Sequence, residues 1–241
     1  GYGNIDIDAA KKKNIVVTNT PNVLTDATAE IAMLILLGAS RRVKEGIEWV
    51  NKKNWKWSSG FLIGKQLTGS NLGILGMGRI GRAFADLARS FGMKIHYYNR
   101  SRLDKNLEKD AIYHKSLESL LSVSEFFSIN CPATKETRHI INKKTIKHFP
   151  DGAIISNSAR GDMIDDEAMV EALKSGKIFS LGLDVYNGEP NIHPEYLTLP
   201  NVFVLPHLGS ATKKTRIAMG DLAIRNIDDF FKNKKCENQV N

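Results

Sequence analysis

The sequence is poor in cysteine, with only Cys131 and Cys236 among its 241 residues. Two cysteines are too few for the disulfide framework of a small secreted domain or for a multi-cysteine zinc site. Long apolar runs are also missing: the longest, residues 31–37, holds seven residues, whereas a transmembrane helix needs about 20. A signal-peptide pattern is absent as well. We therefore expect a cytoplasmic protein without a metal site or a membrane partner.

Positive charge is in excess. Lysine and arginine together number 34 and aspartate and glutamate 26, which gives a formal net charge of +8. The lysines form short clusters that are scattered along the chain, and no arginine-rich arm or stripe of base-stacking aromatic residues accompanies them. We interpret the charge as a lysine-rich surface and expect no nucleic-acid partner.

Short apolar segments alternate with helical segments from about residue 70 onward. Most of these short segments are apolar throughout, as parallel strands covered on both faces by helices should be. The helical period is clearest at residues 79–91, and a second helix is expected at 165–174. The alternation predicts an α/β fold with a doubly wound parallel sheet. The expected strands are residues 72–75, 94–98, 126–129, 153–156, 181–185 and 202–205.

The segment before the expected sheet has a different character. Residues 26–40 predict a helix whose middle is apolar all round, so we expect it to be covered by a domain junction or another subunit. It is followed by an arm that carries Trp55, Trp57 and Phe61 among polar residues. Such an arm needs a partner surface.

A glycine-rich motif, G-M-G-R-I-G at residues 76–81, joins the first expected strand to the first helix of the sheet region. In this strand–loop–helix context the motif predicts a dinucleotide-binding loop. Gly76 permits the tight turn, Gly78 lets the backbone approach a pyrophosphate, and Gly81 lets helix and strand pack closely. The helix N-terminus would offer N–H groups and a partial positive charge to the phosphates.

The residue that follows the second expected strand is Asn99, 18 residues after Gly81. An acidic residue near this position binds the ribose 2′-hydroxyl of NAD and repels the 2′-phosphate of NADP, whereas an amide is neutral. Arg100 offers that phosphate a bidentate fork and Ser101 a hydroxyl. Since a charge-assisted hydrogen bond contributes about 1.5–3 kcal/mol, we expect NADP(H) as cofactor, with NAD(H) as the alternative.

Three later segments place reactive side chains within four residues of the ends of expected strands. Arg160 lies in S-N-S-A-R-G, Glu189 follows the strand that ends in L-D-V, and His207 lies in L-P-H-L-G-S. Ligands bind at the carboxyl edge of open α/β sheets. Singly, these residues also fit a surface cation, a turn and a structural histidine. Together with the glycine loop, they favour an anion clamp, a carboxylate and an acid/base group in one site.

These segments resemble the D-isomer-specific 2-hydroxyacid dehydrogenases. The resemblance covers nearly the whole chain, from G-Y-G-N-I-D at residues 1–6 onward. It is carried by G-M-G-R-I-G at 76–81, C-P-A-T-K-E-T at 131–137, N-S-A-R-G at 157–161 and L-D-V-Y-N-G-E-P at 183–190.

The sequence is most similar to the glyoxylate/hydroxypyruvate reductase branch of that family. This likeness is carried by L-T-D-A-T-A-E at 24–30, N-R-S-R at 99–102 and L-P-H-L-G-S-A-T at 205–212. It implies NADPH-dependent reduction of a small 2-keto acid to the D-2-hydroxy acid.

The resemblance implies a role for each residue of the expected site. Arg160 would bind the substrate carboxylate and polarise the keto oxygen, and His207 would be the general acid that protonates it. Glu189 would orient the imidazole through a hydrogen bond. Asp184 would face the nicotinamide carboxamide. The implied cofactor contacts are Thr28, Gly76, Gly78, Arg79, Ile80, Gly81, Asn99, Arg100, Ser101, Arg102, Cys131, Pro132, Thr137, Ser158, Ala159, Asp184 and Gly209.

The resemblance also implies two domains. We expect residues 1–22 to be the remnant of a truncated, flavodoxin-like substrate domain, residues 23–207 to form the dinucleotide-binding domain, and residues 208–241 to return to the substrate domain as a helix. The family has a further N-terminal half-domain, and Gly3 stands where it usually has aspartate. We therefore expect either a fragment of a longer protein or an incomplete substrate site.

The helix at 26–40 and the aromatic arm would form a homodimer interface, with Phe61 as the candidate to reach the neighbour's substrate pocket.

Two other functions stay open. A dinucleotide-sensing regulator of the corepressor type could keep the same three reactive residues. An NAD-linked member of the family, such as a phosphoglycerate dehydrogenase, would favour an acidic residue where Asn99 stands.

Overall fold

The computed structural model describes residues 2–53 and 55–241. The chain divides into two compact units. One unit comprises Gly1–Ala27 together with Ser210–Asn241, and the other comprises Thr28–Gly209. The larger unit contains the sheet and every residue expected to contact substrate or cofactor.

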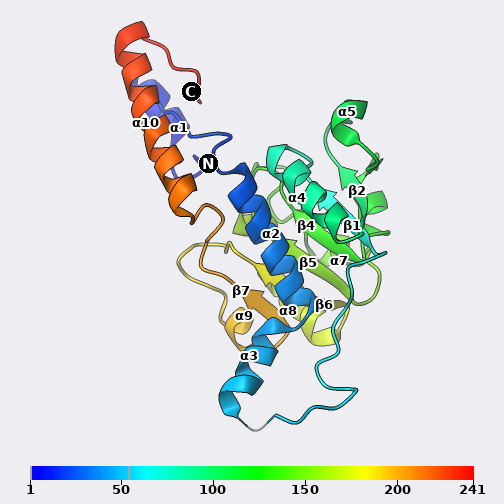
Figure 1. Ribbon diagram of the computed structural model, residues 1–241. Coiled ribbons are helices and arrows are strands. Elements are labelled where there is room, and N and C mark those ends of the chain that lie inside the picture. The colour runs from blue at the N-terminus through cyan, green and yellow to red at the C-terminus, as the bar shows by residue number, and fades with distance from the viewer. Residues whose placement is uncertain (1, 54) are drawn as a thin grey trace. The chain divides into compact units, whose positions relative to one another are not determined.

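All strands of the sheet run parallel, in the order β3-β2-β1-β4-β5-β6-β7 (Figure 1). The chain starts at the centre with β1, moves outward through β2 and β3, and returns to build the other half from β4 to β7. This confirms the predicted doubly wound sheet. The strands are β1 (Asn71–Leu75), β2 (Lys94–Tyr98), β3 (Ile112–Tyr113), β4 (Phe126–Ile129), β5 (Ala153–Asn157), β6 (Ile178–Leu183) and β7 (Val202–Val204).

The core consists of two apolar layers, one on each face of the sheet. Side chains alternate between them, because successive residues of a strand point to opposite faces. In β1, Ile74 joins the layer beneath α2 and α4, and Leu75 joins the layer beneath α8. In β5, Ile154 and Ile155 divide in the same way. Burial on both faces explains why the strands read as continuous apolar runs.

The helices of the larger unit cover both faces of this sheet. Helix α4 (Arg79–Ser90) buries Phe84, Ala85 and Ala88, as its 3.6-residue period predicts. Helix α8 (Asp166–Ser175) begins after Asp165, whose side chain accepts a hydrogen bond from Ala168 N–H. The remaining helices of the larger unit are α2 (Thr25–Ser40), α3 (Val43–Lys52), α5 (Lys105–Glu108), α6 (Leu117–Leu121), α7 (Lys143–Ile146), the 3₁₀ turn η1 (Gly161–Met163) and α9 (Pro194–Thr198).

The apolar helix α2 is covered mainly by the sheet. Ile35 and Leu36 are fully buried, and Ser180 of β6 donates a hydrogen bond to the carbonyl oxygen of Ala39 at 3.0 Å. Leu34 is 46% exposed. The helix was expected to be covered by a domain junction or another subunit, but its buried side chains pack against the sheet of the larger unit, and Leu34 stays exposed.

Strand β6 differs from its expected bounds, because it spans 178–183 and not 181–185. Ile178 pairs with Ala153 at the start of β5, which extends the strand backward through Phe179 and Ser180. Asp184 directly follows the strand, and its carboxylate binds the backbone after β7.

The smaller unit contains α1 (Ile7–Lys12) and α10 (Lys213–Asn233). Asp6 caps α1 by accepting a hydrogen bond from Ala9 N–H at 2.8 Å. An antiparallel bridge pairs Thr18 with Gln239, so the two chain segments of this unit meet directly. No helix among the described residues has both the length and the apolarity that a membrane crossing requires.

Candidate functional site

The glycine loop, residues 76–78, connects β1 to α4. Gly76 has a φ of +96°, and a Cβ there would collide with the backbone of Cys131. A Cβ at Gly81 would collide with the carbonyl oxygen of Gly76, because α4 approaches the loop closely. A Cβ at Gly78 would meet nothing within 4 Å. Two glycines therefore serve the shape of the loop, and the third keeps a space beside it open.

That space adjoins the start of α4. Gly78 is the N-cap of the helix, and no side chain caps it. The first N–H groups of a helix lack partners within it and carry a partial positive charge. A pyrophosphate placed beside Gly78 would meet the backbone of Arg79 and Ile80.

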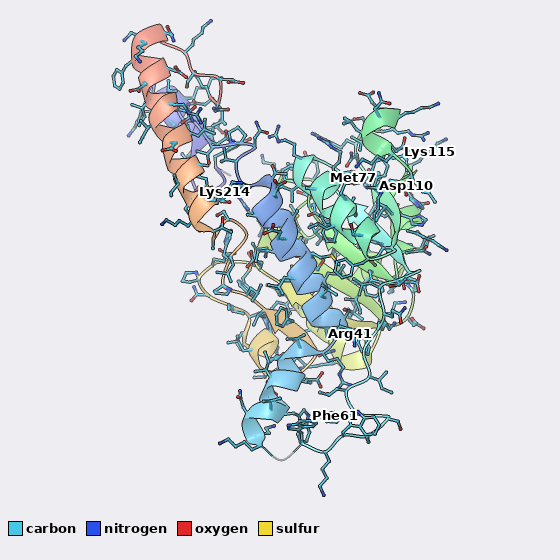
Figure 2. All side chains as sticks on the ribbon, in the orientation of Figure 1. Arg41, Phe61, Met77, Asp110, Lys115 and Lys214 are labelled. Carbon is cyan, nitrogen blue, oxygen red and sulfur yellow. The ribbon has the colours of Figure 1, made fainter. Side chains whose placement is uncertain are left out.

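Asn99, directly after β2, is tied to the glycine loop. Its Oδ1 accepts a hydrogen bond from the N–H of Met77 at 2.7 Å, and Figure 2 labels Met77 in the loop. The N–H of Gly76 donates to the carbonyl oxygen of Tyr98 at 3.1 Å. The residue expected beside the ribose therefore also fixes the phosphate loop. Aspartate could accept the same bond, so the hydrogen bond is compatible with either residue and only the charge differs.

The basic segment after Asn99 carries its charges toward solvent. Arg100, Ser101 and Arg102 are all exposed. Arg102 is paired through Nε with the carboxylate of Glu108, at 3.0 Å to its Oε2.

The neighbouring 131–137 loop also carries expected cofactor contacts. The hydroxyl of Thr137 donates to the carbonyl oxygen of Pro132 at 3.0 Å and accepts from the N–H of Thr134 at 2.7 Å. The pKa of Glu136 is lowered, chiefly by its hydrogen bond with Thr134 and in smaller part by the positive charge of Arg100. Arg100 therefore lies within electrostatic reach of this loop.

Cys131 lies against the glycine loop through its backbone, and its thiol points elsewhere into the protein. Its thiol is largely buried and lies 3.9 Å from the sulfur of Met163. Burial raises the pKa of this thiol to about 11, so it stays protonated near neutral pH. Its backbone closes against Gly76.

His207 and Glu189 form the central pair of the site. The Nδ1 atom of His207, after β7, lies 2.6 Å from Oε2 of Glu189. The other carboxylate oxygen of Glu189 accepts a hydrogen bond from Tyr186 N–H at 2.9 Å. His207 has a φ of 55°, which is uncommon for a residue other than glycine. Glu189 is therefore held by the N–H group of Tyr186, and His207 lies in a backbone conformation that few residues adopt.

Asp184, after β6, holds the loop that carries His207. Its side chain is fully buried and accepts hydrogen bonds from the N–H groups of Leu208 at 2.7 Å and Gly209 at 2.9 Å. Burial raises the pKa of Asp184, and the two amide donors oppose that shift. Since both oxygens already serve the backbone, the carboxylate acts here as a clamp on the His207 loop.

Arg160 follows β5, and its backbone is held by the preceding asparagine. The side chain of Asn157 donates to the carbonyl oxygen of Arg160 at 2.8 Å and accepts from Ala159 N–H at 2.9 Å. The exposed guanidinium of Arg160 donates to the carbonyl oxygen of Ala159 at 2.6 Å. Arg160 makes no hydrogen bond to His207 or Glu189, so these three described residues share an edge of the sheet rather than a hydrogen-bond network.

Two buried polar atoms at the same edge lack hydrogen-bond partners among the described residues. One is the hydroxyl of Ser158, which follows β5, and the other is Oδ1 of Asn130, which follows β4. Such atoms are rarely left unsatisfied unless water or a ligand meets them. Asn130 was not expected from the sequence, because only the folded structure shows that its Oδ1 is buried without a partner.

Thr28 and Gly209 are brought together directly. The hydroxyl of Thr28 donates to the carbonyl oxygen of Gly209 at 3.0 Å. Both therefore adjoin the Asp184 clamp, since Gly209 donates its own N–H to that carboxylate.

Phe61 lies in the extended arm that follows α3, where Figure 2 labels it. Its ring packs edge-on against Trp49 of α3, with ring centroids 5.7 Å apart. Within its own chain, Phe61 is therefore part of an aromatic contact on the arm.

Taken together, the edge formed by the carboxyl ends of the parallel strands carries a glycine loop at β1, an amide at β2, a guanidinium at β5 and an imidazole–carboxylate pair at β7. This combination defines a Rossmann-type domain whose carboxyl edge carries an arginine, a glutamate and a histidine.

Comparison with known proteins identifies the family. The model described as "D-isomer specific 2-hydroxyacid dehydrogenase, NAD binding domain" matches residues 33–209. The chain belongs to the D-isomer specific 2-hydroxyacid dehydrogenase family, as the sequence motifs predicted.

Individual relatives agree with that assignment. The chain is 47% identical over 234 residues to the glycerate dehydrogenase of Hyphomicrobium methylovorum, covering 96% of this chain and 73% of that protein. It is 44% identical over 246 residues to the glyoxylate reductase of Thermococcus litoralis, covering 100% and 74%. An NADPH-dependent glyoxylate/hydroxypyruvate reductase from Sinorhizobium meliloti, solved with NADP and malonate, superposes with a TM-score of 0.91 at 33% identity, covering 100% and 75%.

The residues present fit a nicotinamide dinucleotide, which the family assignment requires. The space beside Gly78, the uncapped start of α4, and the unpartnered atoms of Ser158 and Asn130 all lie along the carboxyl edge. In residues 2–53 and 55–241, no cluster of three His, Cys, Asp or Glu side chains is arranged to hold a metal ion.

Proposed function

We propose that the protein catalyses the NADPH-dependent reduction of a small 2-keto acid, either hydroxypyruvate to its D-2-hydroxy acid or glyoxylate to glycolate. The observation that carries this proposal is the His207–Glu189 contact of 2.6 Å at the carboxyl edge of a dinucleotide-binding sheet. The names of the glyoxylate reductase and glycerate dehydrogenase relatives support the substrate class.

His207 supplies the proton. An ionised Glu189 can only accept hydrogen bonds, so Nδ1 of His207 carries a hydrogen toward it. The protonated imidazole then carries its second hydrogen on Nε2, which donates it to the keto oxygen as that oxygen gains negative charge. Because Tyr186 N–H also holds Glu189, the imidazole keeps its orientation through the proton transfer.

Arg160 binds the substrate. Its guanidinium pairs with the substrate carboxylate and polarises the keto group, and together with His207 it stabilises the developing oxygen charge. The glycine loop and the start of α4 would hold NADPH, which when bound would supply the hydride for the keto carbon. The Asp184 clamp on Leu208 and Gly209 fixes the loop from which His207 acts.

The preference for NADPH rests on the residues after β2. Asn99 is neutral, and Arg100 and Ser101 are exposed beside it. The Sinorhizobium meliloti structure, whose name states NADPH dependence, supports the same cofactor.

The smaller unit is proposed to belong to the substrate domain. It combines Gly1–Ala27 with Ser210–Asn241, which correspond closely to the segments expected from the family resemblance.

An Asn99→Asp variant tests the cofactor preference. Aspartate retains an acceptor for Met77 N–H and adds one negative charge where the 2′-phosphate would lie. We expect kcat/KM with NADPH to fall at least tenfold, about 1.4 kcal/mol, and kcat/KM with NADH to rise or stay the same. A wild-type protein that favours NADH would contradict the proposal.

Steady-state kinetics with glyoxylate, hydroxypyruvate, pyruvate and phosphohydroxypyruvate test the substrate. Turnover of glyoxylate or hydroxypyruvate well above that of the other two is the expected result. If the protein binds the dinucleotide but turns over none of the four acids, the alternative of a dinucleotide-sensing regulator would be favoured.

A further inference from the structure

Glu108 is a buried carboxylate to which neither the sequence motifs nor the proposed mechanism gives a role. It ends the short helix α5, and Figure 1 shows this helix beyond the end of β2. The residue is only 3% exposed. Burial of a carboxylate is unfavourable unless its charge is paired and its oxygens are hydrogen-bonded. The residue that pairs with the Glu108 carboxylate therefore indicates the role of this side chain.

The partner is Arg102, and the contact uses one edge of the guanidinium only. Nε lies 3.1 and 3.0 Å from the two carboxylate oxygens of Glu108. Within the described part of the chain, neither terminal nitrogen of Arg102 makes a hydrogen bond. The Arg102 side chain is 62% exposed, and its Cζ lies 5.8 Å from the centre of the Tyr113 ring. The guanidinium is thus held on one edge and one face and open on the other edge.

The segment that carries Arg102 is itself fixed at both ends. Asn99 accepts from the glycine loop, and the phenol oxygen of Tyr97 accepts from Leu103 N–H at 3.1 Å. The residues between these two anchors are Arg100, Ser101 and Arg102, which is the segment proposed to meet the ribose 2′-phosphate. A guanidinium held in place loses less conformational freedom when it binds an anion than a mobile one does.

We propose that Glu108 is a positioning residue for NADPH, holding Arg102 by Nε so that its two terminal nitrogens bind the 2′-phosphate. The inference rests on the NADPH preference proposed above. It adds the guanidinium of Arg102 to that of Arg100 as a group that binds the 2′-phosphate. Arginine suits this arrangement because its rigid, planar group can bind one anion at each edge, whereas a lysine ammonium has no second edge.

The test is the Glu108→Gln variant, which keeps the size of the side chain and removes its charge. Titration calorimetry would compare two probes, adenosine 2′,5′-bisphosphate and 5′-AMP, which differ by the 2′-phosphate. We expect the dissociation constant of the bisphosphate to rise about threefold to tenfold and that of 5′-AMP to stay unchanged. KM for NADPH should rise by the same factor with kcat unchanged.

Two further variants separate positioning from a general effect on stability. In an Arg102→Gln background, Glu108→Gln should weaken bisphosphate binding no further, because the group it positions is gone. Glu118→Gln, on the exposed face of α6, serves as the matched control and should leave both probes unchanged.

The outcomes distinguish this inference from the proposed function. Equal binding of the two probes by the wild-type protein would overturn the NADPH preference and, with it, the role of Glu108. If the wild type binds the bisphosphate more tightly, the preference stands. The role of Glu108 is then overturned if Glu108→Gln affects both probes alike, affects neither, or tightens bisphosphate binding.

Discussion

At the scale of single residues, the site is built from side chains that use one atom for structure and another for chemistry. Glu189 binds Tyr186 N–H with one oxygen and His207 with the other. Asn99 holds Met77 N–H while standing where the ribose is proposed to bind. This double use means that a substitution must be chosen to remove one task and keep the other.

His207→Asn removes the proton donor of the proposed mechanism and leaves the glycine loop intact. We expect kcat to fall by about 10²- to 10⁴-fold, which is the usual contribution of a positioned general acid. The dissociation constant for NADPH, measured by nicotinamide fluorescence, should not change. Retained turnover would contradict the acid/base role.

Cys131 should be chemically inert in the folded protein. Because burial raises the pKa of its thiol to about 11, only about one thiol in a thousand is ionised at pH 8. In a Cys236→Ser variant, reaction with a chromogenic disulfide at pH 8 should be slow until denaturant is added. Fast labelling of the folded variant would show that the thiol is more open than the structure indicates.

At the scale of elements, the turn from β1 into α4 contains one glycine that the backbone packing requires and another that lies beside open space. A Cβ at Gly81 would strike the carbonyl oxygen of Gly76, and a Cβ at Gly78 would meet open space. Gly81→Ala should therefore destabilise the fold by about 1–3 kcal/mol in denaturant unfolding. Gly78→Ala should leave unfolding nearly unchanged and raise KM for NADPH at least tenfold. Matching effects on stability for the two variants would contradict this division of roles.

Most of the sheet was predictable from sequence because its strands are buried on both faces. Uniform apolar runs gave β1, β2 and β4 with at most one residue of error. β3 was not expected, since a two-residue strand at the sheet edge has no periodicity to detect. β6 was displaced because pairing with β5, which is a tertiary contact, extends it backward to Ile178.

Some residues of the candidate site could likewise be predicted from the sequence, and others could not. Residues within local motifs, such as Gly76 and His207, could be found because motif and strand end coincide. Asn130 and Glu108 could not, because their importance comes from an unpartnered oxygen and a buried ion pair. The unpartnered oxygen and the ion pair both arise only when the chain folds, so the sequence alone does not show them.

At the scale of the whole molecule, α3 and the arm that follows it leave large apolar side chains exposed. Trp57 is 80% exposed, and Ile47, Val50 and Trp55 are exposed with it. Exposed apolar patches of this kind mark interaction surfaces. The proposal of a homodimer through α2 and this arm follows from these side chains.

Light scattering tests that assembly at micromolar concentration, and a dimer is expected. Trp57→Lys should shift the protein toward monomer, because burying a lysine in an apolar interface is unfavourable. Leu197→Lys, at an exposed position on α9, is the matched control and should leave the mass unchanged. A wild-type monomer would contradict the interface.

The strand order also determines the order in which the parts of the sheet can form during synthesis. β1 lies at the centre of the sheet and is made first, but its partner β4 is not complete until residue 129 has been synthesised. The sheet then grows outward, and β7 joins its far edge last. His207 comes three residues after that strand, and Glu189 and Asp184 precede it. During synthesis the glycine loop at residues 76–78 can therefore form before the segment that carries His207 has been made.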